Sequence, residues 1–207
     1  MSDWLPLFPL PMVAFENETF RLHIFEPRYK KMMAQLQQSE PLFLLGTSLD
    51  RTLQSMGALV RLVSIDERYE DGSLDISCRC QERVVLTGVS EAATIDDFDS
   101  ACCEPLAFVD DENKEMNLRL LDLLSQIYEL SQVGKNVPNK GGSYLDWVHK
   151  CGMELAREYE MAALTSVSER QHYALNHLKS LLHTLEQVEH MKQLVHLNGH
   201  AKRLSLL

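Results

Sequence analysis

Cysteines and histidines are the residues of this chain whose chemistry could hold a metal ion. Zinc sites favour cysteines about two to four residues apart, with further Cys or His ligands at similar spacing. Cys78 and Cys80 meet the first condition. They also share the apolar side of an expected strand with Leu74 and Ile76, so we interpret them as small core residues. A metal role for this pair is the less favoured alternative.

The histidines concentrate after residue 148, where seven of the eight are found. His172, His183 and His190 lie near one face of an expected helix, but neighbours are separated by about 16 and 10 Å along its axis. One ion cannot bridge those distances. His196 and His200 are four residues apart, with an Asn-Gly pair between them that is expected to end the helix. We therefore interpret the histidines as a solvated polar face and predict no metal site.

Glycine-rich sequence motifs would indicate nucleotide binding or hydrolase chemistry. The chain has no Gly-x-x-x-x-Gly-Lys-Ser/Thr, no Gly-x-Gly-x-x-Gly and no Gly-x-Ser-x-Gly. Gly134-Lys135 and Lys140-Gly141-Gly142 are interpreted as parts of a flexible linker. Acidic pairs such as Asp66-Glu67 fall in expected turns. No one pair stands out as the general acid and general base of a catalytic site. The prediction is a binding protein without a cofactor, and not an enzyme.

Charge and hydropathy narrow the class of partner. The formal net charge is −10, and residues 1–110 hold 9 basic against 18 acidic residues. A nucleic-acid binder needs a basic patch, which this acidic half does not suggest. No apolar run approaches the roughly 18–20 residues that span a bilayer. Neither a basic leader nor a disulfide framework is evident, so a cytoplasmic protein is expected.

Residues 1–110 consist of short strand-like segments separated by turn residues, a pattern typical of a β-rich domain. Leu5–Leu10 predicts a strand that prolines would confine to a sheet edge. Pro27 is expected to begin a helix. Asp71-Gly72 predicts a turn that leads into a strand with one buried face. Other strands are expected at residues 20–25, 42–46, 58–65, 83–89 and 101–109.

Residues 111–207 change to helical periodicity and form the second expected domain. A first helix is predicted over residues 111–133, followed by a linker over 134–142. Ser143 is expected to cap a helix that runs through Trp147 and Leu155, with a bend at Gly152. Ser166 or Ser168 would cap a last, long helix. The coarse prediction is a β-rich domain followed by a helical one.

Two blocks of sequence resemble the N-terminal domain of the Lon (peptidase S16) protease family. They are Leu5-Pro6-Leu7-Phe8-Pro9-Leu10 and the more specific Leu22-His23-Ile24-Phe25-Glu26-Pro27-Arg28-Tyr29. Residues 57–89, with Arg83 near their end, and the helical tail are also similar to that family. The resemblance implies an α+β fold in which a PUA-like β-barrel, residues 1–110, precedes an α-helical bundle, residues 111–207.

The resemblance also implies a role. In full-length Lon this domain precedes an ATPase module and a Ser-Lys protease module, and it helps to recognise substrates and to assemble a hexamer. The 207 residues have no Walker motif and no room for two further modules. The expectation is therefore a non-catalytic protein that recognises polypeptide or a partner protein, and a homo-oligomer is compatible with it.

The matched blocks supply the candidate site residues. Lys30 and Lys31 on the expected helix, and Phe15 and Phe20 near the preceding loop, are expected to be exposed and to bind polypeptide. Family members often have Phe-Pro-Gly where this chain has 15–17, Phe-Glu-Asn. The shape of this loop is therefore expected to differ.

The other residues of the second block have an expected structural role. Phe25, Tyr29 and Met33 are expected to pack the helix on the barrel. Glu26 would favour the positive end of the helix dipole, and Arg28 would pair with a carboxylate.

Two alternatives to polypeptide recognition stay open at this point. One is a small-molecule-binding protein or an enzyme that uses a pocket in the barrel. The other is an RNA-binding protein, since PUA-like barrels can bind RNA, although the acidic first half argues against it.

Overall fold

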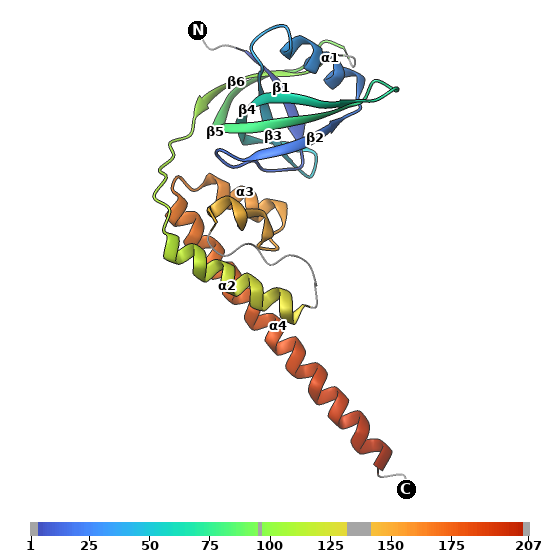
Figure 1. Ribbon diagram of the computed structural model, residues 1–207, viewed down its shortest axis with the longest axis vertical. Helices are drawn as coiled ribbons and strands as arrows, with labels where there is room; N and C mark the ends of the chain where they lie inside the picture. The colour runs from blue at the N-terminus through green and yellow to red at the C-terminus, as the bar shows by residue number, and fades with distance from the viewer. Residues whose placement is uncertain (1–3, 95–96, 132–141, 205–207) are drawn as a thin grey trace. The chain divides into compact units, whose positions relative to one another are not determined.

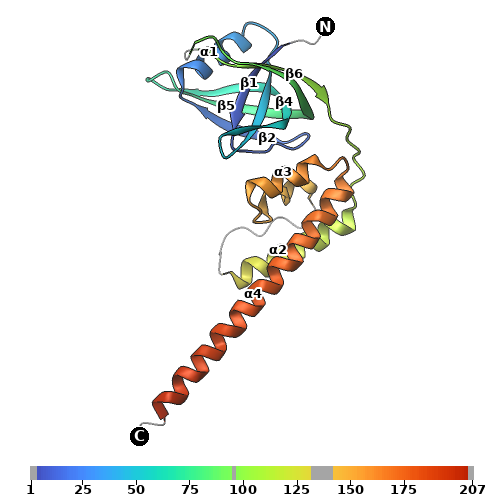
Figure 2. The same ribbon diagram turned by 180° about the vertical axis from the view of Figure 1, so that it is seen from behind.

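The computed structural model describes residues 4–94, 97–131 and 142–204, with the side chains of the last helix described as far as Leu194. The strands are β1 (Leu5–Leu10), β2 (Thr19–Ile24), β3 (Leu42–Leu49), β4 (Thr52–Arg68), β5 (Leu74–Ser90) and β6 (Ser100–Pro105). The helices are α1 (Pro27–Leu36), α2 (Lys114–Leu130), α3 (Leu155–Ala163) and α4 (Val167–Leu204), with short 3-10 helices η1 (Tyr144–Asp146) and η2 (Val148–Lys150). The predicted α+β class, strands first and helices after, is confirmed (Figures 1 and 2).

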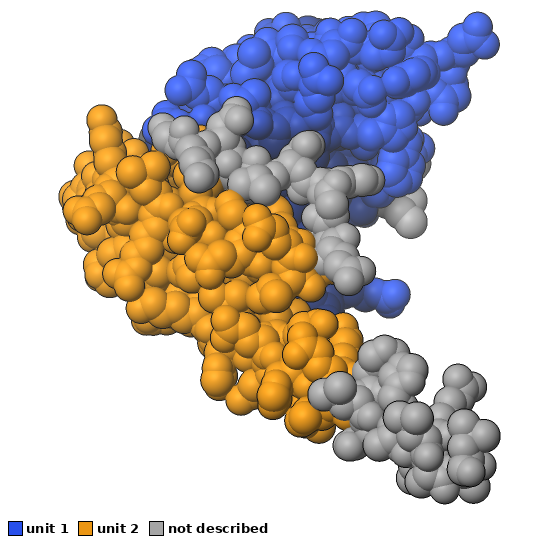
Figure 3. Space-filling model, turned by 60° about the horizontal axis from the view of Figure 1, so that its bottom comes forward, with its two compact units in different colours: residues 1–108, 154–165 blue, residues 109–153, 166–207 orange. Residues whose placement is uncertain are grey.

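The chain forms two compact units, which Figure 3 distinguishes by colour. Unit 1 comprises residues 1–108 together with 154–165. Unit 2 comprises residues 109–153 together with 166–207. The short helix α3 thus belongs to unit 1. Its Tyr159 hydroxyl oxygen accepts a hydrogen bond of 3.0 Å from the backbone amide of Met56 on β4.

Unit 1 is built on one six-stranded sheet in the order β2-β5-β4-β3-β1-β6. A further pairing of β6 with β5 closes the sheet into a ring that leaves β2 outside. The long strand β5 makes this possible, because its first part pairs with β2 and its later part with β6. β4 occupies the opposite side of β5. β2 therefore has a single strand neighbour among the described residues.

The expected position of Leu5–Leu10 at a sheet edge is wrong. β1 has the expected bounds, Leu5–Leu10, but it lies between β3 and β6. Its prolines are tolerated because of where their nitrogens point. The Leu7 amide donates to the Asp99 carbonyl on the β6 side, and backbone donors alternate in direction along a strand. Pro9 therefore faces β6 beyond the end of their short pairing, and Pro6 faces β3 before that pairing begins.

The core of unit 1 follows the alternation of β5. Its side chains at 74, 76, 78 and 80 are buried, which confirms the predicted one-sided strand and the core role of Cys78 and Cys80. Helix α1 begins at Pro27 as predicted. Its buried residues join the same core and are Tyr29, Met32, Met33 and Leu36. Because these side chains fill the space beside the sheet, α1 is fixed against the barrel at the end of β2.

The two turns at the ends of β4 use positive φ angles. Gly72 has φ 78°, as the predicted Asp-Gly turn requires. Between β3 and β4, Asp50 and Arg51 have φ angles of 49° and 64°. Turns of this kind favour glycine at the second position, because a side chain strains the backbone there.

Replacing Arg51 with glycine is expected to relieve that strain and to raise the free energy of unfolding by about 0.5–1 kcal/mol. Urea denaturation measures the change. Arg51→Ala is the matched control, since it removes the same side chain but keeps a Cβ at φ 64°. A glycine variant no more stable than the alanine variant would show that the turn is unstrained.

Unit 2 begins with the predicted helix over 111–133, observed as α2. Asn113 caps it, since its side-chain oxygen accepts a hydrogen bond of 3.1 Å from the Met116 amide. Ser166 caps α4 by accepting one of 3.2 Å from the Glu169 amide, as one of two predicted caps. Both views show α4 continuing past α2. The predicted linker over 134–142 lies outside the described residues except for Gly142.

The continuous helix expected from Ser143 through Leu155 is wrong. Ser143 does act as a cap, accepting a hydrogen bond of 3.3 Å from the Leu145 amide, but the helix it caps is the short η1. Gly152 has φ 66°, a left-handed conformation that no right-handed helix can continue through. The helical conformation is therefore interrupted at Gly152, and a separate helix, α3, begins at Leu155.

A buried polar cluster joins α2, α4 and η1 within unit 2. The Trp147 indole donates a hydrogen bond of 2.9 Å to the side-chain oxygen of Asn117, and the Gln171 amide donates one of 2.6 Å to the same oxygen. The Asn117 amide in turn donates one of 2.9 Å to Glu112. Buried polar groups are stable only when they are bonded in this way, so the cluster fixes how these helices pack.

Candidate functional site

The structure tests the exposure expected of the four candidate residues. The expected exposure of Phe15 is wrong, because its side chain is 0% exposed. The loop turns back at this point: the Glu18 carboxylate accepts a hydrogen bond of 2.9 Å from the Phe15 amide, and the Glu18 amide donates one of 3.1 Å to the Phe15 carbonyl. Asn17, where the family often has glycine, has φ 67°. Asparagine tolerates this conformation better than most residues.

The other three candidates lie at the surface to different degrees. Phe20 on β2 is half-buried against the core. Lys30 is also half-buried, and its Nζ donates a hydrogen bond of 3.0 Å to the Asp71 carbonyl. Lys31 is exposed and forms an ion pair of 2.7 Å with Asp97. The two lysines thus have different partners, and a binding role for any of these residues stays a prediction.

The expected packing of Phe25 on the barrel is wrong. Tyr29 and Met33 pack on the barrel as predicted, but the Phe25 side chain is 62% exposed. It follows His23 by two residues at the end of β2, and alternate side chains share one face of a strand. His23 points outward, and the Phe25 ring stacks on its imidazole with centroids 6.1 Å apart. The expected pairing of Arg28 is confirmed, with Glu26 at 2.9 Å.

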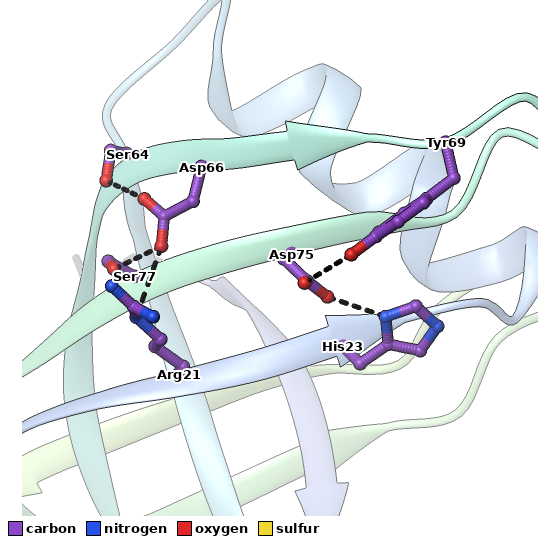
Figure 4. A network of polar contacts seen from close by, with 7 residues as sticks. All are labelled: Arg21, His23, Ser64, Asp66, Tyr69, Asp75 and Ser77. Atoms are coloured by element: carbon purple, nitrogen blue, oxygen red, sulfur yellow. Dashed lines mark hydrogen bonds and ion pairs between the residues drawn. The ribbon is translucent and has the colours of Figure 1, made fainter.

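His23 and Phe25 belong to a larger outward-facing cluster, part of which Figure 4 shows. The His23 Nδ1 donates a hydrogen bond of 2.6 Å to Asp75, whose other carboxylate oxygen accepts one of 2.7 Å from the Tyr69 hydroxyl. The Tyr69 ring meets the imidazole edge-on at 5.7 Å and is itself an exposed residue. Three aromatic rings and a carboxylate therefore gather where β2 and the β4–β5 turn meet.

A second carboxylate lies further along the same face. Asp66 accepts hydrogen bonds of 2.6 Å from both Ser64 and Ser77, and it pairs with Arg21 at 3.5 Å (Figure 4). The Arg21 side chain is 82% exposed. We call the cluster of Arg21, His23, Phe25, Asp66, Tyr69 and Asp75 the β2 surface.

The strand register explains why these groups meet. Arg21 lies opposite Ser77, and His23 lies opposite Asp75. The Cys80 amide donates to the Glu18 carbonyl, so the bonded pairs of this ladder fall on the even residues of β2. Arg21 and His23 are thus in non-hydrogen-bonded pairs, whose side chains are the closer ones. The alternation could have revealed this surface from sequence, but the pairing of β2 with β5 could not be read there.

The hydrogen bonds of this surface displace the pKa values of its carboxyls. The hydrogen bond from His23, and then that from Tyr69, holds the pKa of Asp75 below its ordinary value of 3.8. Hydrogen bonds from Ser64 and Ser77 likewise lower the pKa of Asp66. A lowered carboxyl pKa adds stability above the unfolded-state pKa, and this is lost as the pH falls through the folded value.

Replacing His23 with alanine is therefore expected to raise the pKa of Asp75 toward 3.8. Carbon-13 NMR titration of the carboxyl measures it directly. Arg21→Ala is the matched control and should raise the pKa less, because Arg21 contributes the smallest of the effects on Asp75. An Asp75 carboxyl that titrates identically with and without His23 would contradict the hydrogen bond.

Metal clusters, bilayer-spanning helices and grooves are the other features that could indicate a function. No three His, Cys, Asp or Glu side chains within residues 4–94, 97–131 and 142–194 converge as ligands for a metal ion. His196 and His200 lie outside the described side chains. In the described part of the chain, no helix has both the length and the apolar character of a bilayer span. An open groove of about 430 Å³ lies between α1 and β4, lined by residues that include Leu36, Pro41, Val63 and Arg68.

Comparisons with known proteins place the chain in a family. A family model, described as the ATP-dependent protease La (LON) substrate-binding domain, matches residues 4–197. No curated protein matches the chain significantly.

Two solved structures resemble this one. The Lon N-terminal domain protein from Xanthomonas campestris is 20% identical, with a TM-score of 0.59 over 87% of this chain and 97% of that one. The N-terminal domain of Mycobacterium avium complex Lon protease is 12% identical, with a TM-score of 0.61 over 86% of this chain and 98% of that one. At such identities the likeness concerns the fold, and it confirms the predicted PUA-like architecture. Because the family match extends over nearly the whole length, the chain belongs to the family of the Lon protease substrate-binding domain.

Proposed function

We propose that this chain is a non-catalytic module that recognises exposed stretches of polypeptide through the β2 surface. The family match carries the proposal, since the matched domain is described as the substrate-binding domain of an ATP-dependent protease. The substrate of a protease is a polypeptide. An unfolded protein, or a partner protein that presents an extended segment, is the ligand class that follows.

The composition of the β2 surface supports this role. The side chains of Phe25 and Tyr69 are 62% and 45% exposed, although aromatic residues usually lose most of their surface on folding. Exposed aromatic rings supply much of the binding energy at protein interfaces. Beside them, Asp75 and Arg21 offer charged groups already held in place by hydrogen bonds or ion pairs. Such a surface can bind apolar segments and also orient them.

A cytoplasmic setting is part of the proposal. All five cysteines are thiols, and buried thiols are stable in a reducing compartment. Unfolded chains released during synthesis or heat stress are then the available ligands.

Fluorescence anisotropy with labelled casein, a naturally unfolded protein, tests the proposal. The full chain is expected to bind casein with a dissociation constant in the micromolar range. Phe25→Ala should weaken binding about tenfold, since truncating one central aromatic residue removes at least about 1.4 kcal/mol. Leu118→Ala is the matched control, because Leu118 is a comparably exposed apolar residue, at 51%, in unit 2. Equal losses in both variants, or no binding by the folded wild-type chain, would refute the proposal.

A further inference from the structure

One edge of the strand β2 has no partner strand among the residues that the structure describes. The strand pairs with β5 along its whole length, and β5 is its one neighbour in the described sheet. Within the described chain, no backbone group hydrogen-bonds the outward side of Thr19, Arg21 or His23. An edge of this kind presents unused N–H and C=O groups, which form a template for another strand.

The register determines which groups are available. The bonded pairs with β5 are those of Phe20 and Leu22, because the Cys80 amide donates to the Glu18 carbonyl and the pattern repeats every second residue. The N–H and C=O groups of Thr19, Arg21 and His23 consequently point away from β5. They are spaced as the ladder of an additional strand requires.

The side chains along this edge indicate what would pair there. Phe20 and Leu22 point toward the core but are only partly buried, so an added strand with apolar residues at alternate positions would cover them. On the opposite face stands Arg21, whose side chain is 82% exposed and whose ion pair with Asp66 is long, at 3.5 Å. A carboxylate on the added strand would lie across from this guanidinium at cross-strand distance.

We infer that β2 binds its ligand by strand addition: an extended polypeptide segment, with apolar residues at alternate positions and an acidic residue opposite Arg21, pairs with the free edge. The inference rests on the proposed function and specifies its ligand class. Main-chain hydrogen bonds would supply sequence-tolerant affinity, and the alternating side chains would supply preference. Phe25 and His23 stand at the end of this edge, where they would contact the continuation of the segment.

Arg21→Pro in the full chain tests the inference. Proline removes the outward N–H of residue 21 but leaves the ladder to β5 intact, because that N–H is not used there, and edge strands tolerate proline. Arg21→Ala is the matched control, since it removes the side chain and keeps the N–H. The probe is a capped peptide that alternates valine with threonine and has one central glutamate. Arg21→Pro is expected to weaken peptide binding about tenfold or more, and Arg21→Ala only about threefold.

A second probe needs no protein variant. The same peptide, N-methylated on alternate residues along one edge, cannot form the ladder and is expected not to bind the wild-type chain. Equal binding of the methylated and parent peptides overturns strand addition, even if Arg21→Pro fails to fold. So does an Arg21→Pro variant that folds and binds like Arg21→Ala. A concentration-dependent wild-type dimer that Arg21→Pro abolishes also overturns it, because a second copy then occupies the edge.

The two proposals fail in different ways. If the wild-type chain binds casein but neither Arg21→Pro nor peptide methylation changes binding, polypeptide recognition stands and strand addition is wrong. If the folded wild-type chain binds neither casein nor the peptide, the proposed function itself is wrong.

Discussion

Replacing Trp147 with alanine is expected to lower the free energy of unfolding of unit 2 by about 4 kcal/mol. Trp147 is the largest of the fully buried side chains, at 0% exposure, so its loss leaves a large cavity. It also leaves the buried oxygen of Asn117 with one fewer donor, because the indole N–H that donated at 2.9 Å is gone. Urea unfolding followed by far-ultraviolet circular dichroism measures the change.

Trp147→Phe separates the two contributions. Phenylalanine keeps most of the apolar volume but lacks the N–H, while the Gln171 amide still donates to Asn117 at 2.6 Å. We expect a loss of about 1–2 kcal/mol, since a partly satisfied acceptor costs less than an orphaned one. If Trp147→Ala destabilises the protein by less than this control does, the described packing of α2, α4 and η1 is wrong.

Replacing Phe15 with alanine is expected to destabilise unit 1 by about 3–5 kcal/mol. Removing a fully buried aromatic ring loses the free energy gained by transferring it out of water, and it also creates a cavity in the core. Its 0% exposure places it among the largest fully buried residues of the chain. Phe20→Ala is the natural comparison, since Phe20 is only half-buried, and about 1–2 kcal/mol is expected for it. Thermal unfolding of the two variants gives the ranking.

The variants Phe15→Ala and Phe20→Ala also distinguish a residue that only stabilises the fold from one that contributes to binding. At a temperature where Phe15→Ala is folded, it should bind casein as the wild-type chain does, because Phe15 offers no surface to a ligand. Phe20→Ala should bind more weakly, since Phe20 lies on the strand that we propose as the docking edge. A folded Phe15→Ala variant with greatly weakened affinity would show that this loop takes part in recognition.

Much of the fold could be predicted where the pattern is local. The alternation along residues 74–80 predicted a strand with one buried face, and Pro27 predicted the first turn of α1. The Asp71-Gly72 pair predicted its turn. In each case the determinant is a short-range preference, such as side-chain alternation or a φ angle that one residue type favours.

The predictions of secondary structure that are wrong concern features that depend on strands far along the chain or on the backbone angle of a single residue. Leu5–Leu10 was predicted at an edge because it holds prolines, but which neighbour each nitrogen faces depends on β3 and β6, far along the chain. Gly152 was expected to bend a helix, whereas its φ of 66° ends one. Sequence allows both outcomes for a glycine, since glycine adopts either sign of φ readily.

The candidate site was predicted only in part, for a related reason. Phe15 and Phe25 were assigned opposite environments to those observed, 0% and 62% exposed respectively. Burial of an aromatic residue beside a strand depends on the phase of alternation. The alternation is regular within β2, but Phe15 and Phe25 lie outside the bounds of that strand, where the sequence does not show whether the alternation continues. His23 contacts Asp75 and Tyr69. Both partners lie about fifty residues further along the chain, so residue spacing in the sequence could not predict these contacts.

Amide hydrogen exchange of the wild-type chain, with and without bound casein, tests most directly whether polypeptide is recognised at the β2 surface. The outward amides of Thr19, Arg21 and His23 should exchange rapidly in the free protein, because the ladder to β5 does not use them. Bound casein should slow their exchange and leave that of α2 unchanged. Protection confined to unit 2, with unchanged exchange along β2, would contradict the account.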